Sequence, residues 1–227
     1  MKTRNRYNTR PEHIRESTTR EKVLKNIRHA LIEPSENPFS QVEFDSPVHA
    51  PIQDLPDVTF ATEFAKAGGS FVFCDSPADM VDKVRRVFDD KLWEQAWCND
   101  EPLSAMLRHA GIKVKKANDD TGEMRVAITG CEYLIARTGS IMVSSRLNSG
   151  RRMHAYPEVH VVIAFTSQVV NDIQDALEKV RIRYNGRLPS QISLLTGPSR
   201  SADIEKTLVM GAHGPKELFV FMADDAG

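Results

Sequence analysis

Short apolar runs alternate with helical segments over most of this chain, and few folds accommodate that order. Runs typical of buried strands occupy residues 70–74, 95–98, 113–116, 124–129, 140–143, 159–165, 191–195 and 218–222. Segments with helical period and helix-capping residues lie between them, at residues 58–67, 77–89, 102–110 and from 167 or 171 to about 184. Parallel strands need crossover connections, usually helices, which then cover both faces of the sheet. The sequence therefore predicts an α/β fold around a mostly parallel sheet.

The first 57 residues follow a different pattern. Thr18 and Glu21 have the spacing of a capping box, and an apolar stripe of helical period predicts a helix over residues 19–32. Prolines then follow at positions 34, 38, 47, 51 and 56, as in an extended linker or wrapping arm. We expect residues 1–57 to form an N-terminal helix with a proline-rich arm, and residues 58–227 to form the compact domain. The helix is expected to dock on that domain or on a neighbouring subunit. The sequence therefore leaves open whether the chain forms a homo-oligomer.

Composition excludes several classes of function. With 30 basic and 31 acidic residues the net charge is −1, so no broad surface for nucleic acid or an anionic membrane is expected. The longest apolar runs are too short to cross a bilayer, and the first 20 residues lack the apolar stretch of a signal peptide. Cys74, Cys98 and Cys131 form no C-x-x-C unit for zinc or an iron–sulfur cluster. We expect reduced thiols, a cytoplasmic location, and no metal or cofactor in this chain.

A polar segment near the C-terminus offers the first candidate binding site. Gly197 permits a tight turn, while Ser201 as an N-cap and Asp203 in the first turn of a helix would have purely structural roles. Ser199 and Arg200 lie where the N–H groups of that helix would point towards an anion. Arg200 could hold a carboxylate or phosphate there in a bidentate grip. Spacing alone leaves both readings open.

A histidine between glycines is the second candidate. His213 follows Gly211 and precedes Gly214, which leaves room for the ring to approach a ligand. Its imidazole could act as an acid, a base or a hydrogen-bond donor near neutral pH. A turn before the last strand, with His213 bonded to backbone, explains the same residues equally well.

Hydroxyl groups around a glycine form the third candidate. Thr138 and Ser140 flank Gly139 at the start of a predicted strand, where they could offer hydroxyl and N–H groups to an anion. Glu132, in a predicted short helix or turn over residues 132–136, is a candidate general base. A plain strand–turn–strand connection with a solvated Glu132 is the alternative.

The basic loop over residues 146–157 is expected to lie in solvent or over the mouth of a pocket. His154, Glu158 and His160 have side chains of the kinds that bind zinc. On a strand Glu158 and His160 share one face, but His154 lies beyond a proline, so the three need not converge. The sequence therefore favours no metal site.

Three stretches between residues 130 and 222 together resemble the lactate utilization protein C family, which carries the LUD domain. They are GCEYLIARTGSIMV with its A-x-T-G-S core, YPEVHVVIA, and TGPSRSADIEKTLVMGAHGPKELFVFM. Each stretch alone is unspecific, but their combination in this order is specific. No such signature lies upstream of about residue 58.

The resemblance implies a three-layer α/β/α fold similar to the ribose-5-phosphate isomerase and CoA-transferase group. It also implies a role in bacterial oxidation of L-lactate to pyruvate, beside two partner proteins that carry iron–sulfur clusters. The chain would then be a non-redox component that holds a small carboxylate or another anion, with His213 and Glu132 as candidates for proton transfer. The candidate ligand-binding residues are Thr138, Gly139, Ser140, Gly197, Ser199, Arg200 and Asp203.

Two other functions stay open. A stand-alone enzyme acting on a phosphorylated sugar or an acyl-CoA would need Glu132 or Asp203 to face the pocket, and the support for it is only an analogy of fold. A non-catalytic assembly or regulatory subunit would use the N-terminal helix and the proline-rich arm for docking. No G-x-G-x-x-G motif occurs, so the sequence offers no evidence for a nicotinamide site.

Overall fold

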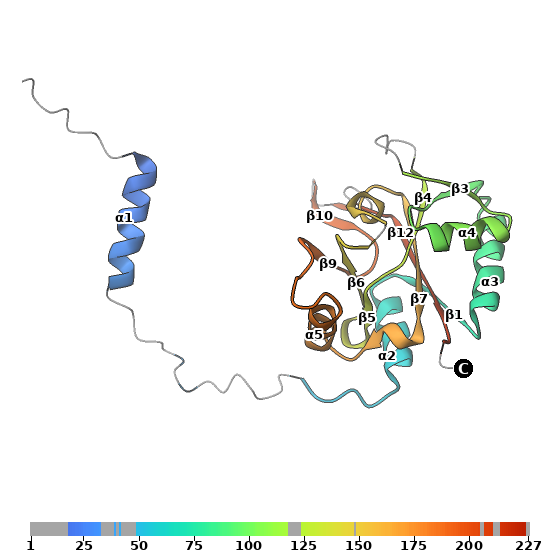
Figure 1. The fold of residues 1–227 in the computed structure, drawn as a ribbon, viewed down its shortest axis with the longest axis horizontal. Helices are drawn as coiled ribbons and strands as arrows, with labels where there is room; N and C mark the ends of the chain where they lie inside the picture. Colours follow the sequence, from blue (N-terminus) through green and yellow to red (C-terminus); the bar gives the residue numbers. More distant parts are fainter. Residues whose placement is uncertain are drawn as a thin grey trace, which may run out of the picture. The chain divides into compact units, whose positions relative to one another are not determined.

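The computed structural model describes residues 18–32, 39, 41, 49–117, 124–147, 149–204, 207–210 and 214–225, and for residues 201–210 it describes the backbone alone. The chain divides into two compact units, residues 1–50 and 51–227, and the boundary expected after residue 57 stays a prediction. The first unit contains helix α1 (Thr19–Ile32), all of whose residues are exposed (Figure 1). None of the described helices is long and apolar enough to cross a membrane.

The capping box predicted for α1 is confirmed. The backbone N–H of Glu21 donates to Thr18 Oγ1 at 3.3 Å, and the N–H of Thr18 donates to Glu21 Oε2 at 2.8 Å. Two N–H groups that the helix itself leaves unpaired are satisfied in this way, which fixes where the helix begins. The spacing of these two residues was sufficient to place the helix start.

The second unit is built on a six-stranded parallel sheet with the order β1-β12-β7-β4-β2-β3 (Figure 1). Its strands are β1 (Ser70–Cys74), β2 (Gln95–Trp97), β3 (Lys113–Lys115), β4 (Val126–Thr129), β7 (Val159–Phe165) and β12 (Glu217–Ala223). The neighbouring interior strands β7 and β12 are buried over almost their whole length. Strands covered on both faces need continuous apolar sequence, and these are the longest apolar runs of the chain. The predicted parallel α/β sheet is confirmed.

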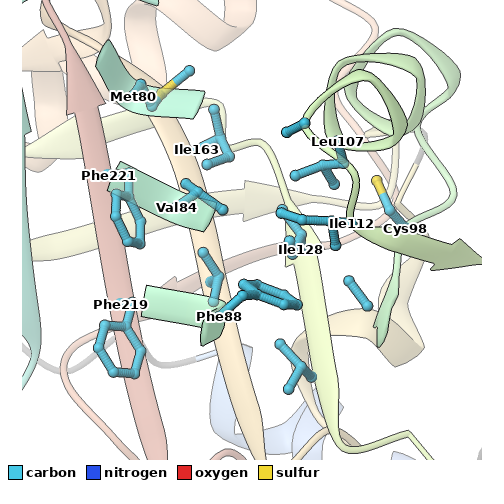
Figure 2. Packing of buried hydrophobic residues seen from close by; sticks show 14 of the residues in the cluster. Met80, Val84, Phe88, Cys98, Leu107, Ile112, Ile128, Ile163, Phe219 and Phe221 are labelled. Carbon is cyan, nitrogen blue, oxygen red and sulfur yellow. The ribbon is translucent and has the colours of Figure 1, made fainter. Parts of the chain in front are cut away.

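Helices α3 (Pro77–Asp90) and α4 (Glu101–His109) cover one face of this sheet. The sequence offers Asp75 or Ser76 as the cap of α3, and in the structure Ser76 is the cap, because its side chain accepts a hydrogen bond from the N–H of Asp79. Figure 2 shows Met80, Val84 and Phe88 of α3 lying along one side of the helix against the strands. Their spacing of four residues places them on one helical face, so burial of that stripe holds α3 to the sheet.

A second, mixed sheet covers the other face together with helix α2 (Pro56–Lys66). Its strand order is β8-β5-β6-β9, and helix α5 (Ile173–Arg183) packs on its far side. The strands are β5 (Tyr133–Ile135), β6 (Ser140–Ser144), β8 (Val169–Val170) and β9 (Ile192–Leu195). Phe60 and Phe64 of α2 are fully buried between the layers and stack with ring centroids 5.4 Å apart.

Two local predictions are wrong. The short helix or turn expected over residues 132–136 is largely the strand β5, whose three residues Tyr133, Leu134 and Ile135 are all buried. The helix expected to begin at Ser201 is also absent, because β10 (Arg200–Ile204) pairs antiparallel with β11 (Thr207–Met210). In both places strand pairing overrides the local capping signal, which acts only within a few residues.

Glycines let helix α2 approach the rest of the domain closely. Gly139 has a φ of 59°, and a Cβ added there would overlap the backbone nitrogen of Phe64. Gly197 has a φ of 76°, and its added Cβ would overlap the carbonyl oxygen of Ala67 at the end of the helix. These glycines of the predicted binding motifs are therefore required by the packing of α2.

Replacing Gly139 should be markedly more harmful than replacing a glycine in open space. Gly139→Ala combines a left-handed backbone with an overlap against α2, so we expect it to lower the free energy of unfolding by about 3 kcal/mol. Gly186 also has a positive φ of 75° but nothing within 4 Å of an added Cβ, so Gly186→Ala should cost about 1 kcal/mol. Urea denaturation of both variants measures the difference, and equal losses would contradict the close packing at Gly139.

Candidate functional site

The two predicted hydroxyl motifs meet in the structure. The Thr138 hydroxyl donates to Ser140 Oγ at 2.7 Å, and Ser140 Oγ lies 2.7 Å from Thr196 Oγ1, which is 56 residues away in sequence. Antiparallel pairing of β6 with β9 brings these residues side by side. Ser140 is only 2% exposed, so its hydroxyl serves the chain of hydrogen bonds and does not face open solvent.

Arg200 lies at the carboxyl end of α2. One of its guanidinium nitrogens donates to the carbonyl oxygen of Ala67, the residue that ends that helix. Carbonyl groups at a helix end lack partners and carry partial negative charge, so a cation is favourable there. Arg200 therefore has a structural bond, and its guanidinium carries further N–H donors besides the one that makes it.

A cavity of about 420 Å³ opens beside this contact. The cationic side chains Arg151 and Arg200 both line it and both are exposed. Ser199 and the backbone of Gly197 also line it, so three of the predicted ligand-binding residues share this one cavity. Asp203 lies further along β10, and nothing is described of its side chain. We refer to this space as the arginine cavity.

His154, from the short helix η2 (Arg151–His154), forms part of the wall. It is only 9% exposed, and neither ring nitrogen has a hydrogen-bond partner in the described part of the chain. Leaving a buried polar group without a partner is costly, so native structures rarely do so without a ligand or water. Both nitrogens are themselves covered by protein atoms, so a polar ligand in the arginine cavity would pair with them only after the ring rotates.

A second buried histidine lies behind the first. The rings of His154 and His160 have centroids 5.4 Å apart, and His160 Nε2 lies 2.8 Å from Thr129 Oγ1. Burial lowers the pKa of His154 to about 4, and burial together with the neighbouring His154 lowers that of His160 to about 3. Both rings are therefore neutral at physiological pH, and each offers one donor and one acceptor.

Glu132 is not among the residues that line the arginine cavity. Its carboxylate is fully buried and accepts hydrogen bonds from Ser144 Oγ at 2.5 Å, Arg183 Nη1 at 2.7 Å and the Tyr184 hydroxyl at 2.7 Å. Ser144 is the last residue of β6, whereas Ser140, which carries the hydroxyl cluster, is the first. The alternative of a solvated Glu132 is therefore wrong, because the carboxylate is a partner in a buried ion pair.

The remaining candidates are placed differently. His213 lies outside the described residues, so its role as a proton-transfer group stays a prediction. Among the residues that the structure describes, no three His, Cys, Asp or Glu side chains gather as a metal site. Arg151 and His154 belong to the basic loop expected to lie in solvent or over the mouth of a pocket, and both line the arginine cavity. Neither residue is predicted from the sequence to bind a ligand, although the charge of the loop is a signal for Arg151.

Comparison with known proteins identifies the family. The family model described as the LUD domain matches residues 59–222, which include both sheets and the arginine cavity. This chain belongs to the LUD domain family. The match begins within α2 and ends in β12, so it covers the compact domain and leaves out α1.

Relatives of this LUD domain protein include several named lactate utilization protein C. The one from Halalkalibacterium halodurans is 31% identical over 172 residues, which is 68% of this chain and 75% of that protein. The one from Geobacillus kaustophilus is 35% identical over 113 residues, which is 48% of this chain and 47% of that protein. The chain thus spans about half the length of several curated relatives that it matches.

A solved structure supports the fold of the LUD domain. The crystal structure of a DUF162 family protein from Deinococcus radiodurans matches with a TM-score of 0.56 and 19% sequence identity. The match covers 74% of this chain and 96% of that chain. At this identity the likeness concerns the arrangement of strands and helices alone.

Burial of the two neutral histidines makes the stability of the LUD domain depend on pH. Their folded pKa values, about 4 and about 3, lie below the ordinary 6.5, so the unfolded state binds more protons between these limits. The stabilisation is complete above pH 6.5 and is lost as the pH falls towards 4, at about 1.4 kcal/mol per pH unit for each histidine. Urea denaturation at pH 7, 6 and 5 measures this slope.

The variant His154→Leu should reduce the slope of the unfolding free energy against pH by the contribution of one histidine, about 1.4 kcal/mol per pH unit. His109 on the exposed end of α4 provides the control, because His109→Leu removes an imidazole from the surface. A wild-type stability that stays constant from pH 7 to 5 would contradict the burial of neutral histidines.

Proposed function

We propose that this protein is a component of a lactate utilization system and that the arginine cavity binds a small 2-hydroxy or 2-oxo monocarboxylate such as L-lactate or pyruvate. The names of the relatives from Geobacillus kaustophilus, Shouchella clausii and Halalkalibacterium halodurans support the first part. The second part rests on one observation, namely that two exposed arginines line the same cavity as a buried imidazole, whose nitrogens have no hydrogen-bond partner among the described residues.

The chemistry of the lining suits such a ligand. A carboxylate accepts charge-assisted hydrogen bonds from guanidinium groups, for which Arg151 and Arg200 are the donors. The neutral imidazole of His154 can donate to an oxo oxygen or accept from a hydroxyl group on the neighbouring carbon. The same side chains therefore suit both L-lactate and pyruvate, which differ in whether the carbon next to the carboxylate carries a hydroxyl or an oxo group.

The oxidation itself needs an electron acceptor. Conversion of L-lactate to pyruvate releases two electrons and two protons, and we assign the electrons to partner proteins that carry iron–sulfur clusters. The role proposed for this chain is to hold the carboxylate, with proton transfer by His154 or by His213, whose position is not described. On this proposal the protein acts in the cytoplasm as a non-redox subunit, with no cofactor of its own.

Direct binding tests the cavity. We expect L-lactate or pyruvate to bind the full chain in isothermal titration, and Arg151→Ala to weaken that binding by about tenfold to a hundredfold, the value of a charge-assisted hydrogen bond. Arg200→Lys keeps the charge near Ala67 but loses the planar fork, so it should weaken binding without unfolding α2. Arg187→Ala removes an exposed arginine outside the cavity and serves as the matched control. Equal affinity for wild type and Arg151→Ala would contradict the anion site.

The system-level role needs a separate assay. The full chain isolated gently from its native host should bring down proteins with iron–sulfur clusters and support L-lactate-dependent dye reduction. In that preparation Arg151→Ala should lower the rate, whereas Arg187→Ala should not. Dye reduction that is unchanged by complete removal of the chain would contradict the assignment to lactate utilization while leaving the binding result untouched.

A further inference from the structure

The sheet has a point where its connections turn to opposite faces. After β2 the chain enters α4, which packs on the face covered by α3. After β4, the neighbour of β2, the chain enters β5, which packs on the other face. In open parallel sheets, ligands bind in the crevice that such diverging connections leave beyond the carboxyl ends of the strands.

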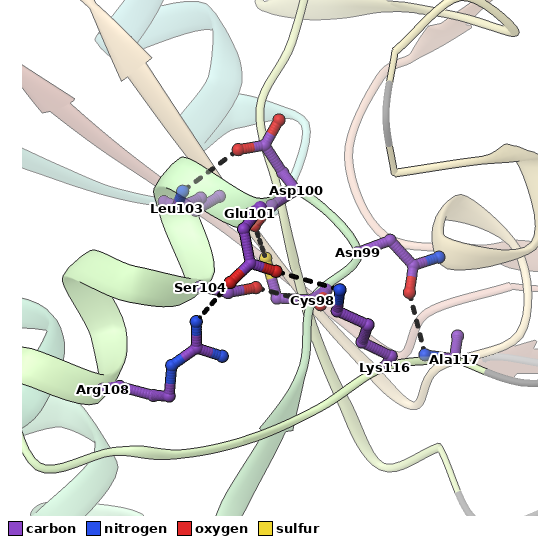
Figure 3. A network of polar contacts seen from close by, with 9 residues as sticks. All are labelled: Cys98, Asn99, Asp100, Glu101, Leu103, Ser104, Arg108, Lys116 and Ala117. Carbon is purple, nitrogen blue, oxygen red and sulfur yellow. Dashed lines mark hydrogen bonds and ion pairs between the residues drawn. The ribbon is translucent and has the colours of Figure 1, made fainter.

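A cavity of about 500 Å³ lies at this place, formed by residues other than those of the arginine cavity. Asp100, which follows β2, and Gly130, which follows β4, line it on the two sides of the divergence. Figure 3 shows Asp100 at the start of α4, where its carboxylate accepts from the N–H of Leu103 at 3.0 Å. The carboxylate is thus engaged in capping the helix, and Leu103 is held facing the cavity wall.

Most of the remaining lining is apolar. Met80 at the start of α3, Met106 of α4 and Phe165 at the end of β7 contribute flexible or aromatic surface. Unbranched methionine side chains adapt to ligands of irregular shape. A wall of this kind gains free energy from contact with an alkyl chain.

Arg183 supplies a fixed positive group in the same cavity. Its Nη1 donates to Glu132 at 2.7 Å, and its guanidinium carbon lies 5.2 Å from the centre of the Tyr133 ring. These two contacts hold the guanidinium in place, while its side chain stays 44% exposed and retains further N–H donors. Asp100 is the one carboxylate among the described residues that line the cavity, and it is engaged as the N-cap of α4.

We propose that this crevice is a second binding site, for an unbranched aliphatic monocarboxylate of about four to eight carbons. The alkyl chain lies against Met80, Met106 and Phe165, and the carboxylate meets the guanidinium of Arg183. Within the described part of the chain, the site shares no lining residue with the arginine cavity.

A chain-length series on the full chain tests the apolar wall. Butyrate, hexanoate and octanoate are titrated by calorimetry, and the affinity should rise by about fourfold per added methylene. Met106→Trp fills the cavity and should weaken octanoate binding by about tenfold or more. Ala105→Trp, at the exposed neighbouring position on α4 and outside the lining, is the matched control and should leave the affinity unchanged.

The charge is tested separately. Octanoate should bind more tightly than 1-octanol, and the double variant Glu132→Gln/Arg183→Gln should remove that preference while avoiding an unpaired buried carboxylate. Thermal unfolding establishes that each variant is folded. Affinity that is independent of chain length, or an equal effect of Met106→Trp and Ala105→Trp, would overturn the proposal. Because Met106→Trp should leave L-lactate binding intact, failure here is distinguishable from failure of the lactate site.

Discussion

The parallel pairing of β7 with β4 on one side and β12 on the other is the constraint on which the domain depends. Because both faces of these strands are buried, one face must be covered by α3 and α4 and the other by α2 and the second sheet. Parallel strands also begin at one edge of a sheet and end at the opposite edge. Residues that precede β12 line the arginine cavity, and residues that follow β4 and β7 line the crevice, so the same pairing separates the two sites.

The packing of α2 and the lining of the arginine cavity depend on the same short motifs in this family member. Gly139 and Gly197 permit close approach of α2, and Arg200 bonds to the end of that helix while lining the arginine cavity. The position of the guanidinium therefore depends on the packing of α2, since its anchor is the carbonyl oxygen of Ala67. Loss of either glycine should displace a cationic group as well as lower stability, which couples the fold to the electrostatics of the cavity.

Much of the fold follows from the sequence because its signals are local and strong. The strand over residues 159–165, the helix cap at Ser76 and the capping box at Thr18 were each predictable from neighbouring residues. The strand β10 was not, because its pairing with β11 outweighs the N-cap signal of Ser201. The site was only partly predictable for the same reason. Ser140 and Thr196 are predicted beside glycines, but only the β6–β9 register brings their hydroxyls within 2.7 Å.

Burial decides which of the candidate acid–base groups can act. Glu132 was attractive by residue type, but three donors and full burial commit its carboxylate to Arg183, Tyr184 and Ser144. His154 belongs to the basic loop and by residue type is a possible metal ligand, yet it lines the arginine cavity, and its two buried nitrogens have no partner among the described residues. For the proposed 2-hydroxy or 2-oxo carboxylate, the carboxylate would meet the two guanidinium groups, and the hydroxyl or oxo group would pair with the imidazole once the ring turns a nitrogen towards the cavity. A simple inorganic anion without a donor hydrogen would satisfy the arginines and the histidine less completely.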